Sequence, residues 1–396
     1  MKPQKILYIY LGIYFLFLLY QASTLSISPT EAQILYNQKS LLHHIVAMEV
    51  SLFGNSDIGF RSFFALVNIV NLLLFYDVAK KSLKKESDAL FAALILSLLP
   101  GFISSSLVVS EAPLVIFLTL LFIYLYKKFR IWSALLFPLM LVVDNSFAVL
   151  FISLFFYALY KKERLLILLS LLFFALSMNF YGFDFGGKPR NYFLDTFGIY
   201  SAIFSPLVFI YFFYVIYRIL VKGPKDLIWF VSFVAFVFSL ILSFRQKIAF
   251  EDFAPFTLIG VVLMVREFLS SYRVRIVEHR ARHKKLFIAV IVSLLINDAI
   301  LVFNKPLYLV LENPGRHFAY NYHLAKELAN ILKKMGIKEV YTDDPDLQLQ
   351  LRFYGIGESL RYKITENKPF RDSVKVSIRY KNIELKRYYV SKLNNK

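Results

Sequence analysis

The sequence predicts an all-α polytopic membrane protein with a small α/β domain at its C-terminal end. Of its 396 residues, 58% are hydrophobic and only 18% are charged, whereas soluble domains are closer to half apolar and a quarter charged. The apolar residues fall into blocks of about 16–22, each near the length that crosses a bilayer. After residue 304 the long blocks give way to short alternating and amphipathic segments.

We expect about eleven membrane-spanning helices, because a helix satisfies its own backbone hydrogen bonds in lipid. Residues 1–23 resemble a signal sequence, but no small-residue cleavage motif follows, so this segment is interpreted as a retained first helix. The fifth and sixth spans are short and meet at a break at Asp144–Asn145. The expected spans are 6–21, 58–79, 88–104, 109–126, 131–143, 146–160, 164–180, 199–217, 226–244, 253–270 and 286–303.

The basic residues in the loops predict the orientation of these spans. One set of alternate loops carries 21 Lys and Arg residues, and the other set carries 5. Basic loops remain in the cytoplasm, so the N-terminus is expected there, and eleven spans place the C-terminal segment outside. The formal charge of +19 is therefore interpreted as a determinant of topology in an inner or plasma membrane, and no nucleic-acid partner is expected.

Residues 304–396 are expected to form a separate outer-face α/β domain, and residues 1–303 the membrane domain. In the terminal domain, "YNYHLAKELANILKKMG" has helical spacing and ends at Gly336, and "PDLQLQLRFYG" predicts a second helix. The segments "KEVYTD", "VKVSIRY" and "IELKRYYV" predict strands. The acidic stretch 342–346, "TDDPD", is interpreted as a turn with a helix N-cap rather than as a metal site.

Carboxylates gather on the expected outer side, together with a few cations. The acids are Glu31, Glu49, Asp57, Glu111, Asp144, Asp184, Asp195, Glu251 and Asp252, and the cations are Lys39, Lys188, Arg190, Arg245 and Lys247. A carboxylate at such a boundary can take a proton from an acceptor group. A cation can hold a lipid-linked phosphate and stabilise it as it leaves. The pattern therefore suits transfer chemistry at the membrane surface.

Each of these acids also has a simpler structural interpretation. Ser28, Pro29 and Glu31 fit a capping box at the start of a helix. Glu111 opens a span, where the helix dipole favours an acid whatever its function. Asp144 is in place to cap the sixth span, and the acids at 251–252 have cations nearby in sequence. Composition alone leaves the capping and the catalytic interpretations both open.

The order of these pieces resembles the membrane-embedded glycosyltransferases of the GT-C class, in the branch of protein O-mannosyltransferases and aminoarabinose transferases. The outer loop 22–57 resembles the acidic motif and jaw helix of that family, with "TEA" in place of Asp-Glu-Ala and "LFGNSDIGFRSFFAL" leading into the second span. "VVSEAPLVIFL" is similar to its acid-x-Pro-Leu start of the fourth span, and "RQKIAFEDFAPF" to its late charged loop. Thr30 stands where an Asp is common, and Glu111 replaces a more usual Asp.

The resemblance implies sugar transfer from a polyprenyl-phosphate donor to a lipid, glycan or protein acceptor on the outer face. It implies that Glu31 is the catalytic base and that Glu111 is a second acid that orients the acceptor or the base. Arg61 lies inside a span, where an unpaired charge is costly, so an outer acid such as Asp57 or a lipid phosphate is its expected partner. Arg61, Arg245 and Lys247 are the candidates for holding the donor phosphate. Asp57, Asp144, Glu251 and Asp252 are expected to support the site.

No cofactor is required by this prediction; a divalent metal is compatible with it, but no metal ligands are assigned. Besides the donor and the acceptor, membrane lipids are the expected partners. The main alternative is a transporter or flippase for a lipid-linked or anionic substrate, which should show mid-span charges and broken helices. Two further alternatives are a lipid-linked glycan polymerase or ligase and a non-catalytic scaffold. The sugar and the acceptor are not specified by the sequence.

Overall fold

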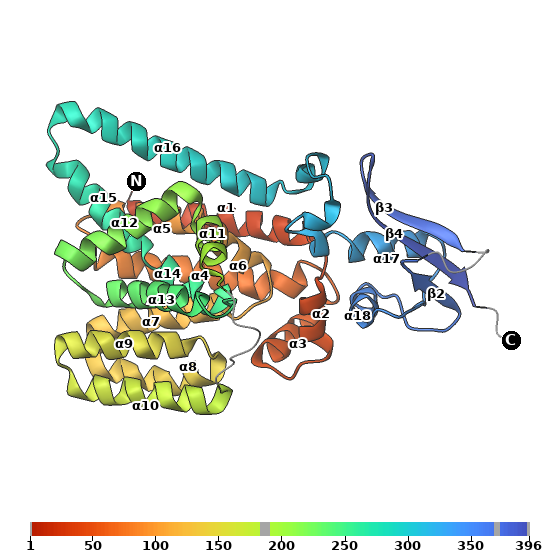
Figure 1. The fold of residues 1–396 in the computed structure, drawn as a ribbon, viewed down its shortest axis with the longest axis horizontal. Helices are drawn as coiled ribbons and strands as arrows, with labels where there is room; N and C mark the ends of the chain where they lie inside the picture. The colour runs from red at the N-terminus through yellow and green to blue at the C-terminus, as the bar shows by residue number, and fades with distance from the viewer. Residues whose placement is uncertain (1, 183–190, 368–372, 394–396) are drawn as a thin grey trace. The chain divides into compact units, whose positions relative to one another are not determined.

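The computed structural model describes residues 2–182, 191–367 and 373–393 of the chain (Figure 1). Its contacts divide the chain into two compact units. The first unit comprises Met1–Phe15, Phe64–Ser106 and Ser110–Asp298, and the second comprises Leu16–Phe63, Leu107–Val109 and Ala299–Lys396. The second unit thus combines the first outer loop with the terminal domain, whereas the expected division at residues 303 and 304 remains a prediction.

The first unit is a bundle of helices. α10 packs on α9, α9 on α13, α12 on α11 and α15, and α15 on α5 (Figure 1). Helices α1 and α4 begin or end in the second unit, as does α16. The elements are α1 (Pro3–Thr24), α4 (Gly59–Lys80), α5 (Glu86–Ser97), α6 (Pro100–Leu107), α7 (Ala112–Phe129), η1 (Arg130–Leu136), α8 (Phe137–Val143), α9 (Phe147–Lys161), α10 (Arg164–Tyr181), α11 (Phe193–Phe204), α12 (Pro206–Lys222), α13 (Leu227–Ser243), η2 (Phe250–Asp252), α14 (Ala254–Leu258), α15 (Val261–Val274) and α16 (Val277–Val302).

Six helical stretches in the described residues are long and apolar enough to cross a membrane, or eight if each of two bent helix pairs is one span. Three shorter apolar helices accompany them, and two of these, α9 and α13, coincide with expected spans. The protein is therefore a multi-pass membrane protein, and the expected number of eleven spans differs from the count of sufficiently long helices. Part of the difference arises because the expected spans 109–126 and 131–143 form one continuous stretch, Ala112–Val143.

Two expected spans are bent in the structure. α5 and α6 meet at 63°, and α11 and α12 meet at 107°. Pro100 and Pro206 begin the second helix of each pair, and proline has no N–H to continue the preceding helix. At the sharper bend Ser205 has a positive φ of 73°, which an L-residue rarely adopts. The hydropathy pattern predicted the apolar content of these segments but not their bends.

The second unit contains two short helices from the outer loop and a terminal α/β domain. The loop helices are α2 (Pro29–Tyr36) and α3 (Leu41–Phe53). The terminal domain contains η3 (Lys305–Leu309), η4 (Pro314–Arg316), η5 (Tyr320–Tyr322), α17 (Ala325–Lys334), β1 (Tyr341–Thr342), α18 (Pro345–Phe353), β2 (Tyr362–Thr365), β3 (Val374–Tyr380) and β4 (Ile383–Lys392). The sheet order is β1-β2-β4-β3, with β1 parallel to β2 and the other pairs antiparallel.

The predicted elements of the terminal domain are confirmed. α17 ends before Gly336, whose φ of 75° is the left-handed conformation that a helix C-terminus favours in glycine. Asp344 caps α18 by accepting from the N–H groups of Asp346 and Leu347, as expected for "TDDPD". The sequence reasoning missed β2, a four-residue strand with little alternation. Its Ile364 is buried in the domain core with Leu328 and Tyr388.

Candidate functional site

Glu31 lies in the first turn of α2 and completes the capping box predicted from the sequence. The Ser28 hydroxyl accepts from the Glu31 N–H at 3.2 Å, and the Ser28 N–H donates to Glu31 Oε2 at 2.9 Å. Pro29 occupies the first helical position, where its missing N–H costs nothing. The capping interpretation of Glu31 is therefore confirmed, and it accounts for one of its two carboxylate oxygens.

Arg61 binds the same carboxylate from the first turn of α4. Its Nη2 lies 2.7 Å from Glu31 Oε2, and its Nε donates to Oε1 at 3.3 Å. Its Nη1 donates to the Leu25 carbonyl at 2.9 Å, and its Nη2 also donates to the Ser26 carbonyl at 3.1 Å. Both side chains are fully buried. The expected partner of Arg61 was an outer acid such as Asp57 or a lipid phosphate, and in the structure the acid is Glu31 rather than Asp57.

Glu31 has no accessible lone pair in this arrangement. Oε1 also accepts from the Val109 N–H at 3.1 Å, so each oxygen receives two N–H donors. A buried carboxylate with these partners is stabilised as an anion, and removing one partner leaves a costly uncompensated charge. To accept a proton from a substrate, Glu31 would have to break this pair first. Its catalytic role stays a prediction, and its geometry describes a structural role.

Asp57 connects the entry of α4 to the terminal domain. Its Oδ1 accepts from the Tyr354 hydroxyl at 2.6 Å, and its Oδ2 lies 2.7 Å from Lys326 Nζ. Tyr354 in turn accepts from the Ile27 N–H at 2.9 Å, and Lys326 donates to the Ser23 carbonyl at 2.9 Å. Burial and then the charge of Asp57 raise the pKa of Tyr354 well above its ordinary value, so this hydroxyl remains a donor.

Gln350 adds a further link by donating to the Ile27 carbonyl at 2.7 Å. Gln33 on α2 donates to Asp346 on α18 at 2.6 Å. Residues 22–31 are thus held by α4 through Arg61 and by the terminal domain through Tyr354, Lys326 and Gln350. We call residues 22–31 with these four side chains the loop anchor. The terminal-domain members could not be predicted from the sequence, because a tyrosine, a lysine and a glutamine on short helices are common surface residues.

Glu49 on α3 is a buried carboxylate that the site prediction did not include. Its Oε1 accepts from the Ser62 hydroxyl at 2.9 Å and from the Phe63 N–H at 2.5 Å. Its Oε2 has no hydrogen-bond partner within the described part of the chain. Burial, opposed by these two hydrogen bonds, raises the pKa of Glu49 to about 7. An acid in an apolar helix was the only sequence signal for it.

Four of the predicted residues form an acidic cluster in the first unit: Glu111, Asp144, Glu251 and Asp252. Glu111 is the N-cap residue of α7 and makes no side-chain capping bond, so the helix dipole is its remaining structural interpretation. Asp144 follows α8 and accepts from the Ser146 N–H at 2.7 Å, and the other two lie on η2. Glu111 and Glu251 are far apart in the sequence, but the fold brings them close enough for the charge of Glu251 to raise the pKa of Glu111.

The pKa values of the cluster show this mutual influence. Burial, together with the charges of Asp144 and Glu251, raises the pKa of Glu111 to about 7. Burial, with the charges of Asp144, Glu251 and Glu111, raises the pKa of Asp252 to about 7. The pKa values of Glu251 and Asp144 are also raised, chiefly by burial. Like charges that share a site cannot all ionise cheaply, so the cluster holds and exchanges protons near neutral pH.

A cavity of about 680 Å³ adjoins the cluster. Asp252 and Lys247 both line it, together with the polar side chains of Asn145, Ser146 and Gln246. The apolar part of the lining includes Phe174, Met178, Phe238, Leu242 and Phe253. A volume of this size accommodates a sugar and part of a lipid chain. Arg245 is exposed two residues before Lys247 and does not line the cavity.

The predicted residues thus fall into two groups. The second unit holds Glu31, Asp57 and Arg61, and the first unit holds Glu111, Asp144, Arg245, Lys247, Glu251 and Asp252. Asp184, Lys188 and Arg190 lie outside the described residues. Within the described ranges, no group of three His, Cys, Asp or Glu side chains is arranged to hold a metal ion. The expectation that no cofactor is required stays a prediction.

Comparisons with known proteins agree with the predicted class. Residues 41–182 match the family model of dolichyl-phosphate-mannose-protein mannosyltransferases. The fold is similar to that of ArnT from Cupriavidus metallidurans bound to undecaprenyl phosphate, with a TM-score of 0.54, 10% identity and 98% coverage of both chains. The apo structure of the same ArnT matches equally well.

An uncharacterised protein of Aquifex aeolicus (strain VF5) is 32% identical over 111 residues, which are 26% of this chain and 22% of that protein. The matched stretch therefore spans only about a fifth of this curated relative. The family-model match and the ArnT-like fold support a GT-C glycosyltransferase, and the resemblance stated from the motifs is confirmed. At 10% identity the structural match establishes the fold, which is the GT-C fold of a multi-pass membrane protein.

Proposed function

We propose that the chain is a glycosyltransferase that moves a sugar from a polyprenyl-phosphate donor to a lipid, glycan or protein acceptor on the outer face of the membrane. The family model covers residues 41–182, and one of the structures with the same fold holds undecaprenyl phosphate. The basic loops support a cytoplasmic N-terminus. These observations favour the class of reaction, and the site must carry the rest of the proposal.

The observation that carries the proposal is the acidic cluster beside a cavity that also contains Lys247. A general base works best when its pKa lies near the working pH, because it is then ionised and still basic. Glu111 meets this condition with a pKa of about 7, and it has no capping bond to break. We assign Glu111 as the base that receives the acceptor's proton, and Asp144, Glu251 and Asp252 as the charges that tune it.

The transfer step exchanges one bond at the anomeric carbon of the sugar for another. The acceptor hydroxyl or amine loses its proton to Glu111 while its oxygen or nitrogen bonds to the anomeric carbon of the sugar. The bond between that carbon and the donor phosphate oxygen breaks, and polyprenyl phosphate leaves with the electron pair. Lys247 in the cavity wall would stabilise the charge that develops on this phosphate.

Glu31 and Arg61 have a different place in this proposal. Both side chains are buried, and Arg61 also donates to two carbonyls of the outer loop. The pair therefore holds the outer loop rather than contacting the donor or the acceptor. The earlier assignment of Glu31 as base and Arg61 as phosphate ligand remains the competing assignment. The two assignments differ in which glutamate is indispensable to turnover in folded protein.

A transporter or flippase is the second candidate, and the two bent helix pairs favour it. Broken helices are typical of secondary transporters, where they line the substrate site. The bends between α5 and α6 and between α11 and α12 meet that description. The acidic cluster, by contrast, flanks the ends of α7 and α8 rather than their middles, as suits chemistry at a surface.

The deciding experiment compares outer-face lipids, glycans and glycoproteins by mass spectrometry in a parent strain, a deletion and complemented deletions. The complementing variants are Glu111→Gln and Glu31→Gln at matched expression. Loss of one sugar-bearing species in the deletion and in Glu111→Gln, with recovery in Glu31→Gln, supports the proposal and identifies the sugar by mass. Recovery in Glu111→Gln with loss in folded Glu31→Gln supports the competing assignment. A deletion that changes distribution across the membrane but no sugar-bearing species supports the transporter.

A further inference from the structure

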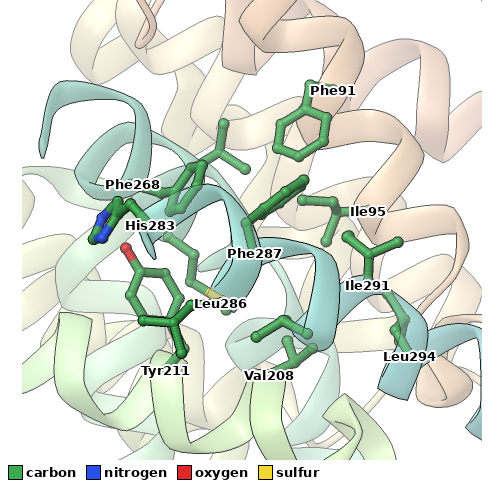
Figure 2. Close-up of a pocket in the computed structure, with 13 residues that line it drawn as sticks. Phe91, Ile95, Val208, Tyr211, Phe268, His283, Leu286, Phe287, Ile291 and Leu294 are labelled. Atoms are coloured by element: carbon green, nitrogen blue, oxygen red, sulfur yellow. The ribbon is translucent and has the colours of Figure 1, made fainter. Parts of the chain in front are cut away.

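A narrow apolar cavity of about 160 Å³ lies among α5, α12, α15 and α16 in the first unit (Figure 2). Most of its lining atoms belong to hydrocarbon side chains. Six of the lining residues come from α16 at helical spacing, so one face of that helix forms a wall. The lining consists of Phe91, Ile95, Val208, Tyr211, Met264, Val265, Phe268, His283, Leu286, Phe287, Val290, Ile291 and Leu294.

A second cavity of about 230 Å³ adjoins the first, because Phe91, Phe268 and Phe287 line both. It adds Tyr272 and Lys284 to the lining. At the end nearest the α15–α16 connection, the apolar cavity is therefore continued by a space that Tyr272 and Lys284 border. Figure 2 shows His283 and Phe268 close together at this end and Leu294 toward the other. The His283 and Phe268 rings are stacked, with centroids 5.5 Å apart.

Among the side chains that the structure describes, Lys284 is the basic residue that lines the second cavity, and its neighbouring arginines have other partners. Arg273 is paired with Asp88 at 2.6 Å, and Arg280 donates to the Arg275 carbonyl at 2.9 Å. Glu267 on α15 is paired with Arg218. Lys284 is paired with no acid whose side chain the structure describes, and it is exposed at the mouth of the second cavity. An anionic group would complement it.

The cavity lies within membrane-spanning helices, so its occupant comes from the bilayer. Only 11% of the apolar stretch of α16 is buried, and the helix is therefore open to lipid along most of its surface. From His283 to Leu294 the helix rises about 17 Å, roughly half the thickness of the hydrocarbon core. The volumes suit one linear acyl chain rather than a whole lipid. This geometry matches a chain that enters from one leaflet.

We propose that this groove binds one acyl chain of an anionic phospholipid, with its phosphate paired to Lys284 and hydrogen-bonded by Tyr272. This site is distinct from the acidic cluster and does not depend on the proposed transfer reaction. The phosphate and the ammonium group form a charge-assisted contact, and the chain replaces void with packed apolar atoms. The occupant is a structural lipid from the leaflet on the side of the basic loops, not the polyprenyl donor.

Native mass spectrometry of the full chain released from nanodiscs tests this proposal. One set of nanodiscs contains phosphatidylcholine alone, and the other contains an added fraction of phosphatidylglycerol. Lys284→Gln removes the proposed phosphate contact, and Lys285→Gln removes a neighbouring charge that lines neither cavity. Ile291→Trp fills the groove, and Leu295→Trp places the same bulk on the exposed side of α16 (Leu295 is 48% exposed).

The wild type is expected to retain one phosphatidylglycerol in preference to phosphatidylcholine. Lys284→Gln should reduce this preference about five-fold, since one basic residue at an anionic surface contributes on that scale, and Lys285→Gln should leave it unchanged. Ile291→Trp should abolish retention, and Leu295→Trp should not. Equal losses in the two lysine variants, or in the two tryptophan variants, would overturn the proposal, as would a wild type that retains no lipid.

A final arm separates the phospholipid from the polyprenyl donor. Undecaprenyl phosphate is added to the phosphatidylglycerol nanodiscs, and the retained phospholipid is counted again. Continued retention of phosphatidylglycerol supports a separate structural site. Stoichiometric replacement by undecaprenyl phosphate that is lost in Ile291→Trp would assign the groove to the donor and overturn the proposal.

Discussion

Glu31 in the second unit and Glu111 in the first unit have opposite surroundings. In the second unit Glu31 is fully buried, and Arg61 together with two backbone N–H groups compensates its charge. In the first unit Glu111 is half-buried, lacks a capping bond and lies under the influence of other acids. A compensated carboxylate holds a structure together, whereas an uncompensated one is basic enough to exchange protons near neutral pH.

The comparison predicts that removing Arg61 has the largest effect on stability. Arg61→Met leaves the Glu31 carboxylate buried without its cation, so the free energy of unfolding should fall by about 3–5 kcal/mol. Thermal unfolding in detergent micelles measures this loss. The double variant Arg61→Met with Glu31→Gln should regain part of it, because no buried charge remains. A double variant that is no more stable than Arg61→Met would show that the pair is not coupled as the distances indicate.

Substitution of Glu111 should affect the rate of sugar transfer more than substitution of Glu31, which is the reverse of their effects on stability. Glu111→Gln should lower the rate of sugar transfer by about 10²–10⁴-fold, the usual contribution of a positioned base, while its thermal unfolding stays near that of the wild type. Glu31→Gln should unfold at a lower temperature yet retain turnover when assayed below it. The measurement is product formation by mass spectrometry in membranes with matched amounts of folded protein. Intact turnover in Glu111→Gln would remove it from the reaction.

The pH dependence of protein stability tests the raised pKa values of the acidic cluster. Because the folded-state pKa of Asp252 is raised to about 7 from 3.8, folded protein holds a proton that the unfolded chain has released. Its contribution to stability is therefore fully present below the unfolded pKa and is lost as the pH rises through about 7. Asp252→Asn should flatten the decline of the melting temperature between about pH 4 and about pH 7, because the unfolded and folded pKa values of Asp252 lie near the two ends of this interval. Glu358→Gln, at an exposed position in the terminal domain, serves as the matched control and should leave that slope unchanged.

Turnover should show the opposite slope. A base must be deprotonated to act, so transfer should increase with pH until Glu111 is ionised, near about 7. The pH profile of initial rates in membrane vesicles measures this, and Glu31→Gln should keep the same midpoint. A midpoint that moves in Glu31→Gln but not in Asp252→Asn would transfer the catalytic role to the second unit.

The sequence predicted the membrane class, the terminal domain and most of the acidic cluster, because hydropathy, strand alternation and acids at span ends are local signals. It did not predict that Arg61 pairs with Glu31, since thirty residues separate them and both also fitted local roles. Tyr354 and Lys326 were missed for a related reason: their contacts with residues 23–27 join segments about 300 residues apart. Long-range pairing of ordinary polar residues leaves no periodicity to detect.

The loop anchor provides the smallest and most local test of the comparison. Tyr354→Phe removes the hydroxyl between Asp57 and the Ile27 N–H, and the free energy of unfolding should fall by about 1.5–3 kcal/mol, as for a hydrogen bond to a charged group. Hydrogen–deuterium exchange should increase at residues 22–28. Tyr320→Phe removes a hydroxyl that bonds Leu385 within the terminal domain, and exchange at residues 22–28 should stay unchanged. Equal protection of this loop in both variants would mean that the Tyr354 hydroxyl does not hold it, and that Arg61 with the Lys326 and Gln350 contacts is sufficient.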